Sequence, residues 1–496
     1  MSHTVPDVHA LWILPFALLL AAIAIMPLWK PRFWEHQYAW FAILLGAVTS
    51  AYYLLFLPEG PSAWLHQMQE YVSFIVLLGS LYIVSGGIVI HISRRATPAA
   101  NTTLLLVGAI AANVFGTTGA AMLLIRPFLR MNRGHIKPFH VAFFIIIVAN
   151  CGGALTPIGD PPLYMGFIRG VPFFWLAESA WMIWAVCNAL LLILFFLLDS
   201  REHARVARHH QHDPGPAVQL YGFQNFFYIG LILLAVFQPS LFDALHDENR
   251  LRLFFNREAM MIAALLLSLI TTQRYIHERN EFKWGPIREV AILFLGIFST
   301  MVPALNYMHH HSDRMPLNTP GQYYYLSGSL SAALDNAPTY LVFFETQQSR
   351  VAHDYAEPLA RLRQHLDAHP PGTLPPPPPN SATPGRPELL AYEALVRYFP
   401  DRLKSGQVRD SDIRIAATIS NPDLALLLIA ISFGSVFFGA CTYIGNGPNF
   451  MVKSIAEHAG VPMPSFFGYL FRYALPILLP IYTLIWLLFF VLAVPG

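Results

Sequence analysis

Charged residues are scarce in this sequence. Asp, Glu, Lys and Arg together make up 12% of the 496 residues, whereas hydrophobic residues make up 55% and the mean hydropathy is +0.47. Soluble domains carry about 25% charged residues, so this composition excludes an ordinary soluble protein and indicates a chain whose solvent is the lipid bilayer. The net charge is only +2, and the basic residues are scattered over short loops. We therefore expect no nucleic-acid partner.

Cysteine is scarce too. Cys151, Cys187 and Cys441 all fall within apolar segments, and their spacing excludes a disulfide framework or a zinc knuckle. We expect no cofactor. The first apolar run, 11–29, follows a stretch without Lys or Arg, so it lacks the positive region of a signal peptide. It is predicted to be a retained membrane span.

Long apolar runs are what the sequence has in abundance. A membrane-spanning helix needs about 20 mostly apolar residues. Such runs lie at 11–29, 37–57, 71–93, 103–129, 139–169, 173–198, 223–243, 258–274, 288–308, 322–345, 422–457 and 466–494. Four of these runs are interrupted near the middle by polar residues, glycine or proline: 103–129, 139–169, 322–345 and 422–457. The pattern predicts an all-α polytopic membrane protein.

The positions of Lys and Arg predict that two of the interrupted runs are re-entrant hairpins. Cytoplasmic loops are enriched in these residues. Basic residues flank the run 103–129 on both sides, for example at Arg94 and Arg130, and a hairpin keeps them all on the inner side. On this scheme the N-terminus lies outside and a second hairpin, 322–345, opens outward. Arg250, in a loop that the scheme places outside, counts against it.

The chain is predicted to comprise about 10 transmembrane helices, two re-entrant hairpins and two discontinuous helices. The first membrane repeat is 1–200, with hairpin 103–129 and broken helix 139–169; the second, inverted repeat is 223–345 and 421–496, with hairpin 322–345 and broken helix 422–457. Residues 346–420 are polar and rich in proline, so they are predicted to be an extramembrane loop outside, with a short helix near 387–400.

The two broken helices share a sequence pattern. Residues 153–165 (GALTPIGDPPLYM) align without gaps with residues 439–451 (GACTYIGNGPNFM) and match at 7 of 13 positions. Both copies lie in the penultimate segment of their half. Interrupted segments at corresponding positions of two halves indicate the binding site of a transporter, because the unpaired backbone groups at such breaks are tolerated only beside protein or water and bind ions well.

Two carboxylates lie near the middle of the apolar segments, Asp160 and Asp335. Ionisable residues deep in a bilayer are expensive, so both are candidate functional groups. Asp160 is the leading choice for a group that holds either a proton or a sodium ion. Each also has a structural interpretation: Asp160 precedes two prolines and could cap the following half-helix, and Asp335 with Asn336 could cap the second hairpin tip. The two roles could coexist.

Three motifs carry a resemblance to a known family: GGALTPIGDPP at 152–162, ALDNAPT at 333–339 and GACTYIGNGPN at 439–449. They resemble the ion transporter superfamily, and are most similar to NhaD-type sodium/proton antiporters and the related arsenite and citrate permeases. The resemblance implies a homodimer in a prokaryotic cell membrane, with a scaffold domain and a transport domain that moves like an elevator. It places the hairpin tips at 116–119 and 335–339 and the helix breaks at 156–162 and 442–448. The dicarboxylate branch has a Ser-Asn-Thr signature at both tips, which is absent here.

The candidate ion- and substrate-binding residues follow from the breaks and the tips. They are Asp160, Asp335, Asn336, Thr339, Thr156, Thr442, Asn446, Asn449, Thr117 and Thr118. Oxygen ligands suit a hard cation, and Asp160, Asn336 and Thr156 are the candidate sodium ligands. Threonine and asparagine also satisfy backbone groups at helix breaks, so a structural role is the alternative for each. Packing of small residues is a further alternative at Thr117 and Thr118.

Two transport functions remain open. The first is sodium (or lithium)/proton antiport, with sodium and the proton as the transported ions. The second is transport of an anion such as citrate, another carboxylate or arsenite, although no Lys or Arg lies at the breaks. An intramembrane aspartyl protease would need a Gly-x-Gly-Asp motif, whereas Asp160 follows Pro157-Ile-Gly. We therefore expect no enzyme activity.

Overall fold

The computed structural model describes residues 6, 8–92, 96–206, 218–238, 256–280, 282–311, 317–369, 372, 374–378 and 386–492. Its long elements up to the middle of the chain are α1 (Leu14–Trp29), α2 (Pro31–Phe56), α3 (Gly60–Gly86), α4 (Pro98–Met131), α5 (Pro138–Ile147), α6 (Pro161–Ile168), α7 (Trp175–Val206), α8 (Gln224–Val236), α11 (Arg257–Thr271), α12 (Arg274–Arg279) and α13 (Gly285–His311). Those that follow are α14 (Pro320–Ala333), α15 (Asn336–Asp354), α16 (Ala356–Asp367), α17 (Pro387–Tyr398), α18 (Pro400–Ser405), α19 (Asp410–Ser420), α20 (Pro422–Phe438), α21 (Gly447–His458), α22 (Phe466–Tyr469) and α23 (Leu475–Trp486).

The described residues also form several short elements. They are the 3₁₀ turns η1 (Ala10–Ile13), η2 (Cys151–Gly153) and η4 (Gly439–Cys441), the π-helical turns η5 (Leu470–Ala474) and η6 (Leu487–Val491), and the strands β1 (Val89–Ile92) and β2 (Val218–Tyr221). Proline stands in the first turn of many helices, as in α4, α6 and α20. It suits that place because its missing N–H is one that the helix leaves unpaired anyway.

The prediction of an all-α polytopic membrane protein is confirmed. Eight helices of the described residues are long and apolar enough to cross a membrane, α4 among them. Two predicted spans, 223–243 and 258–274, are shorter than expected, because α8 has 13 residues and α11 has 15. Residues 239–243 lie outside the described part of the chain.

The first hairpin lies within α4, whose two helical arms, between Pro98 and Met131, meet at a kink. Gly116 has φ 73° and ψ 155°, which is not helical. A straight helix of 34 residues would separate its ends by about 50 Å. Instead the Ala96 N–H donates to the Met131 carbonyl at 3.2 Å, and Asn101 and Asn132 exchange side-chain hydrogen bonds of 2.9 and 2.8 Å. The two arms therefore lie side by side and turn at Gly116, where only glycine adopts the backbone conformation readily.

The second hairpin is formed by α14 and α15. The turn is at Leu334 and Asp335, between the two helices. At the open end, Arg350 on α15 donates to the Leu317 carbonyl and to Asn318 ahead of α14. Tyr323 and Phe343 contact each other edge to face across the arms, with ring centroids 6.3 Å apart.

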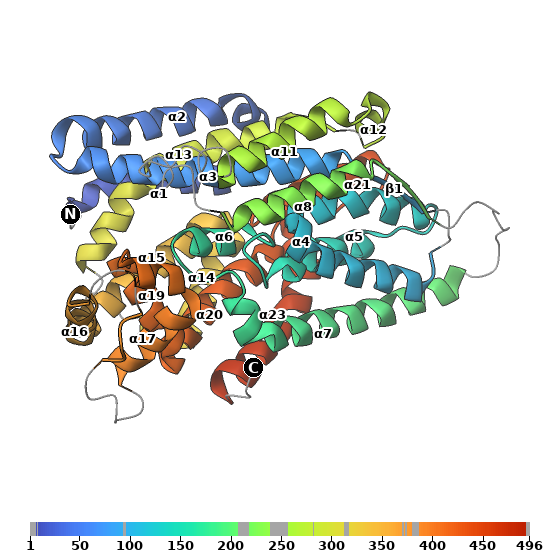
Figure 1. Cartoon of the computed structure of the whole chain (residues 1–496). Coiled ribbons are helices and arrows are strands. Elements are labelled where there is room, and N and C mark those ends of the chain that lie inside the picture. The colour runs from blue at the N-terminus through green and yellow to red at the C-terminus, as the bar shows by residue number, and fades with distance from the viewer. Residues whose placement is uncertain are drawn as a thin grey trace.

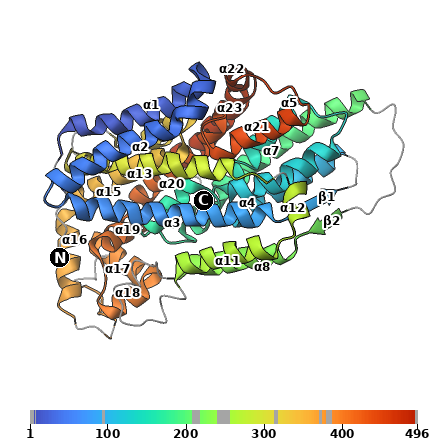
Figure 2. The ribbon, with the colours of Figure 1, turned by 90° about the horizontal axis from the view of Figure 1, so that it is seen from above.

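The helices form two sets that pack against each other (Figure 1). We call α1, α2, α3, α11 and α13 the scaffold set, because they pack mainly on one another and lie together along one side of the molecule (Figures 1 and 2). We call the two hairpins and the two broken helices, α5–α6 and α20–α21, the hairpin set. Its members interlock, α4 with η2 and α21, and α14 with α20.

The open ends of the two hairpins face opposite ends of the helix bundle. Hairpin α4 opens beside β1, β2 and α12, and hairpin α14–α15 opens beside α16 (Figures 1 and 2). Arg126 on α4 donates to Asn280 after α12 at 3.2 Å, and Lys137 lies 3.6 Å from Glu202 on α7. These basic residues therefore share one end of the bundle, as the hairpin interpretation requires. Arg94 and Arg250, which also entered that argument, lie outside the described residues.

The span predicted at 71–93 is displaced along the chain. Helix α3 begins at Gly60 and ends at Gly86, because Gln67 and Glu70, which look like loop residues in the sequence, are buried and hydrogen-bonded. Beyond Gly86, residues 89–92 form β1, which pairs antiparallel with β2. The prediction of helix alone missed this two-stranded ladder.

Residues 346–420 are folded rather than a structureless loop. Helix α15 continues to Asp354, and α16 to α19 follow it. The short helix predicted near 387–400 is present as α17. Spaced apolar residues such as Leu362, Leu395 and Ile415 are buried, and they give these helices a core that the overall polarity and proline content of the segment concealed.

Candidate functional site

The carboxylate of Asp160 lies at the centre of the hairpin set. It precedes α6, and its side chain is buried, with a relative exposure of 1%. Oδ1 accepts hydrogen bonds from Thr117 Oγ1 at 2.7 Å and from Asn446 Nδ2 at 2.9 Å, and Oδ2 accepts one from Asn336 Nδ2 at 2.5 Å. Three donors satisfy a buried negative charge that would otherwise be very costly.

These donors come from the three other interrupted segments. Thr117 lies just after the turn of the first hairpin, Asn336 begins the second arm of the second hairpin, and Asn446 lies at the second helix break. The sequence proposed all four residues as candidates on separate grounds, and the structure brings them together. A single carboxylate thus joins four segments that are far apart in the chain.

Two threonines tie each helix break to the hairpin of its own repeat. Thr156 Oγ1 donates to the Asn113 carbonyl at 2.6 Å, and Thr442 Oγ1 donates to the Ala332 carbonyl at 2.7 Å. Each hydroxyl also accepts a backbone N–H three residues later, at 3.1 and 3.0 Å. The hydroxyls of Thr156 and Thr442 therefore satisfy backbone groups in this structure, and their places are equivalent in the two repeats.

The two central aspartates differ in what they cap. Asp160 makes no capping hydrogen bond to α6, since Pro161 and Pro162 have no N–H to offer and the Leu163 N–H donates to the Asp160 backbone carbonyl at 3.1 Å. The capping interpretation of Asp160 is therefore wrong for this structure. Asp335 does cap α15, because its Oδ1 accepts the Ala337 N–H at 3.1 Å.

A second asparagine pair supports the donors of Asp160. Asn446 Nδ2 also lies 3.3 Å from Asn150 Oδ1, and Asn150 Nδ2 donates to Asn449 Oδ1 at 2.7 Å. Asn449 in turn donates to the carbonyls of Gly439 and Thr442 at 2.9 and 2.8 Å. Asn449 therefore holds the second break together and does not contact Asp160. Sequence reasoning missed Asn150, whose only signal was a polar residue two positions before the glycine pair of an apolar run.

Two other candidates lie apart from Asp160. Thr339 Oγ1 donates to the Asp335 carbonyl within α15 at 3.1 Å, so it stabilises the hairpin tip. Thr118 is half-buried and lines the cavity described below. The breaks also lie earlier than predicted: α5 ends at Ile147 and α20 at Phe438, whereas Pro162 and Pro448 are already in the helices that follow.

Asn336 has one polar atom without a partner. Its Oδ1 is buried and accepts no hydrogen bond from the described part of the chain. Buried polar groups are rarely left unpaired, and an amide oxygen next to a carboxylate is a suitable ligand for a hard cation. The Asp160 carboxylate and Asn336 Oδ1 are oxygens of the kind that a hard cation binds, whereas Thr156, the third predicted ligand, uses its hydroxyl on the Asn113 carbonyl.

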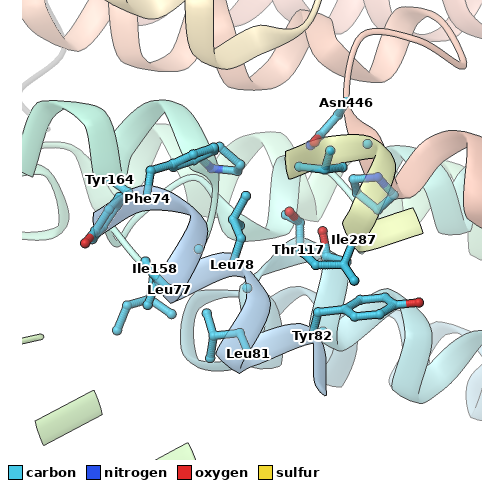
Figure 3. Close-up of a pocket in the computed structure, with 18 of the residues that line it drawn as sticks. Phe74, Leu77, Leu78, Leu81, Tyr82, Thr117, Ile158, Tyr164, Ile287 and Asn446 are labelled. Atoms are coloured by element: carbon cyan, nitrogen blue, oxygen red, sulfur yellow. The ribbon is translucent and has the colours of Figure 1, made fainter. Parts of the chain in front are cut away.

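A cavity lies between the scaffold set and the hairpin set (Figure 3). It encloses about 770 Å³ of empty space, including the part open to solvent. Helices α3 and α13 supply one wall, with apolar residues such as Leu78 and Val290, and the hairpin tip at Gly116 and the starts of α6 and α21 supply the other. Asp335 and Asn446 reach it, and Asp160 lies behind this wall. None of its described lining residues is Lys, Arg or His.

Comparison with known families identifies the family of this chain. The family model described as "Putative citrate transport" (CitMHS_2) matches residues 5–490, nearly the whole chain. The chain belongs to this family. No curated protein matches the chain. Membership of the CitMHS_2 family, together with the eight apolar helices, identifies a multi-pass membrane transporter. It supports the resemblance to ion and citrate carriers and does not show the NhaD type in particular.

Proposed function

We propose that this chain is a secondary transporter of citrate or a related carboxylate, coupled to a cation that binds at Asp160. The family match favours the carboxylate over the sodium/proton antiport that the sequence motifs suggested first. The observation that most supports this proposal is the buried carboxylate of Asp160, which accepts hydrogen bonds from the three other interrupted segments.

The cation has an electrostatic purpose. An anionic substrate and the Asp160 carboxylate carry charge of the same sign, and like charges in a medium of low dielectric constant repel strongly. A sodium ion beside Asp160 Oδ2 and Asn336 Oδ1, or a proton on the carboxylate, removes this repulsion. Binding of the cation and binding of the anion then favour each other, which is the thermodynamic basis of coupled transport.

The position of the cavity supports an elevator-type movement. The cavity lies at the boundary between the scaffold set and the hairpin set, so a displacement of one set along the other carries the site with it. The wall from α3 and α13 is mostly apolar, and such a surface offers few hydrogen bonds that would hold the sets in one position.

A specific observation favours antiport as the second candidate. The cavity contains Asp335 and no cationic side chain among its described lining residues, which suits a cation better than a free anion. In antiport, sodium and the proton would compete for Asp160 itself, since a carboxylate holds one or the other.

Reconstitution into proteoliposomes separates the two candidates. Uptake of radiolabelled citrate driven by an imposed sodium or proton gradient is the expected result. Dissipation of a preset pH gradient by sodium alone, without any citrate uptake, would replace this proposal with antiport. Liposomes that hold the Asp160→Asn variant are the control for leakage.

A further inference from the structure

Two aromatic side chains line one end of the cavity. Phe74 on α3 and Tyr164 on α6 lie together at that end, away from Tyr82 (Figure 3). Their ring centroids are 6.5 Å apart, and the Tyr164 hydroxyl lies 3.4 Å from the Ser73 carbonyl. This layer joins a helix of the scaffold set to a helix of the hairpin set.

A layer of charged side chains follows one helical turn farther out. Glu70 lies four residues before Phe74, so both side chains are on the same face of α3. Glu70 Oε2 accepts a hydrogen bond from Arg169 Nη2 at 2.8 Å, and both side chains are about nine-tenths buried, with exposures of 9% and 11%. Arg169 directly follows α6. Gln67 Nε2 donates to the same Glu70 oxygen at 3.0 Å, and Gln67 Oε1 accepts a longer hydrogen bond from Arg169 Nη2 at 3.5 Å.

Arg169 has a second carboxylate partner on its own side of the boundary. Its Nε lies 2.9 Å from Glu345 Oε1 on α15, a helix of the hairpin set. One arginine therefore makes one ion pair across the boundary, to Glu70, and one within the hairpin set, to Glu345. The exposed His66 lies 3.7 Å from the other Glu70 oxygen.

We propose that the Arg169–Glu70 ion pair is a gate that closes one end of the transport cavity and opens once in each cycle. The inference rests on the proposed function only in its second half, the opening during transport. The closure itself rests on the geometry: Tyr164 lies against Phe74, and Arg169 lies against Glu70 one helical turn nearer Gly60, so two successive layers join α3 to the hairpin set. Any sliding of the hairpin set along α3 must separate Arg169 from Glu70, whereas the Arg169–Glu345 pair moves as a unit.

The test measures access to the cavity without measuring transport. A cysteine introduced at Leu78, which lines the cavity, is labelled with a membrane-impermeant methanethiosulfonate reagent from either side of oriented vesicles. The native cysteines are buried, and vesicles without the Leu78→Cys change measure their background. Glu70→Gln should speed labelling from the side on which α3 begins by about tenfold or more, because loss of one partner of a buried ion pair shifts a two-state equilibrium by at least that factor.

Glu345→Gln is the matched control. It removes an ion pair from the same arginine, but one within the hairpin set, so labelling at Leu78→Cys should stay as in the parent. Equal acceleration by Glu345→Gln and Glu70→Gln would show that the cluster only stabilises packing, and no acceleration by Glu70→Gln would also overturn the gate. Gel filtration of each variant checks folding. A gate that opens in a protein that takes up no citrate would contradict the proposed function while leaving the closure standing.

Discussion

Thr117 and Asn336 occupy equivalent positions in the two hairpins and both donate a hydrogen bond to the same carboxylate, that of Asp160. The equivalence follows from the break threonines, which bind the carbonyls of Asn113 and Ala332; Thr117 and Asn336 each lie four residues later. The backbone of the site is thus pseudo-symmetric. Its charge is not, because Asp160 has the neutral Asn446 at the equivalent place of the other repeat.

The two donors should have opposite effects on binding of a sodium ion. A hydrogen bond to the free carboxylate contributes about 1.5–3 kcal/mol and weakens once a cation neutralises the charge, so Thr117→Val should lower the KM for the cation by up to about ten- to a hundredfold. Asn336→Ala also removes the amide oxygen that we place beside the sodium ion, so it should raise this KM. The measurement is citrate uptake as a function of cation concentration. Thr117→Ser keeps the hydroxyl and should stay close to the parent; a serine variant shifted as far as the valine variant would contradict a role through this hydrogen bond.

The break threonines should contribute equally to stability. Thr156→Val and Thr442→Val each leave a buried carbonyl and a backbone N–H without their partner, which costs about 1–3 kcal/mol. Thermal unfolding in detergent should therefore show similar decreases for both. Thr102→Val is the control, because the Thr102 hydroxyl bonds the Pro98 carbonyl four residues earlier in the same helix. A large decrease for only one of the break threonines would argue against their equivalence.

Gly159 should tolerate no side chain. A Cβ there would lie 2.1 Å from the Gly153 carbonyl oxygen, so the backbone on one side of Asp160 must move. We expect Gly159→Ala to abolish uptake and to destabilise the protein by about 1–3 kcal/mol, as overpacking does.

Gly447 offers the matched comparison at the second break. A Cβ on Gly447 meets no heavy atom within 4 Å, so Gly447→Ala should fold as the parent does. The measurement is the thermal unfolding midpoint of each variant. Equal midpoints for Gly159→Ala and Gly447→Ala would show that the close approach of Gly159 to Gly153 does not affect stability.

Asp335 should prove to be a helix cap rather than the coupling group. Asparagine caps a helix as well as aspartate does, whereas alanine costs about 1 kcal/mol. Asp335→Asn should therefore keep both the unfolding midpoint and the dependence of uptake on the cation, and Asp335→Ala should lower the midpoint. Loss of cation dependence in Asp335→Asn would move the coupling role from Asp160 to Asp335.

The sequence predicted the fold well where one physical cause dominated. Apolar runs gave the membrane spans, and the basic residues around Arg130 required the first hairpin to turn back, which the contacts of Asn101 with Asn132 show. The matched motifs 153–165 and 439–451 located both breaks. Both breaks begin earlier than predicted. In the first, α5 ends at Ile147, and the chain already leaves the helical conformation at Asn150, well before the first proline of the motif.

Features that depend on tertiary partners escaped prediction. Gln67 and Glu70 looked like loop residues, yet Arg169 from a distant segment allows them to be buried in a helix. Arg257 directly precedes the predicted span 258–274, yet it begins α11 and is buried together with Glu258, with Ser73 of α3 donating to Glu258 at 2.6 Å. The role of Asp160 also depended on tertiary contacts. Its carboxylate accepts hydrogen bonds from donors in three distant segments instead of capping α6.

The most direct test of the central claim is citrate accumulation in proteoliposomes by the parent and by Asp160→Asn, under an imposed sodium or proton gradient. Asparagine has nearly the same shape as aspartate but cannot carry its negative charge or its proton. The account predicts that the parent accumulates citrate against its gradient and that Asp160→Asn, although folded, loses this gradient-driven accumulation. Accumulation by Asp160→Asn at the rate and with the cation dependence of the parent would contradict it.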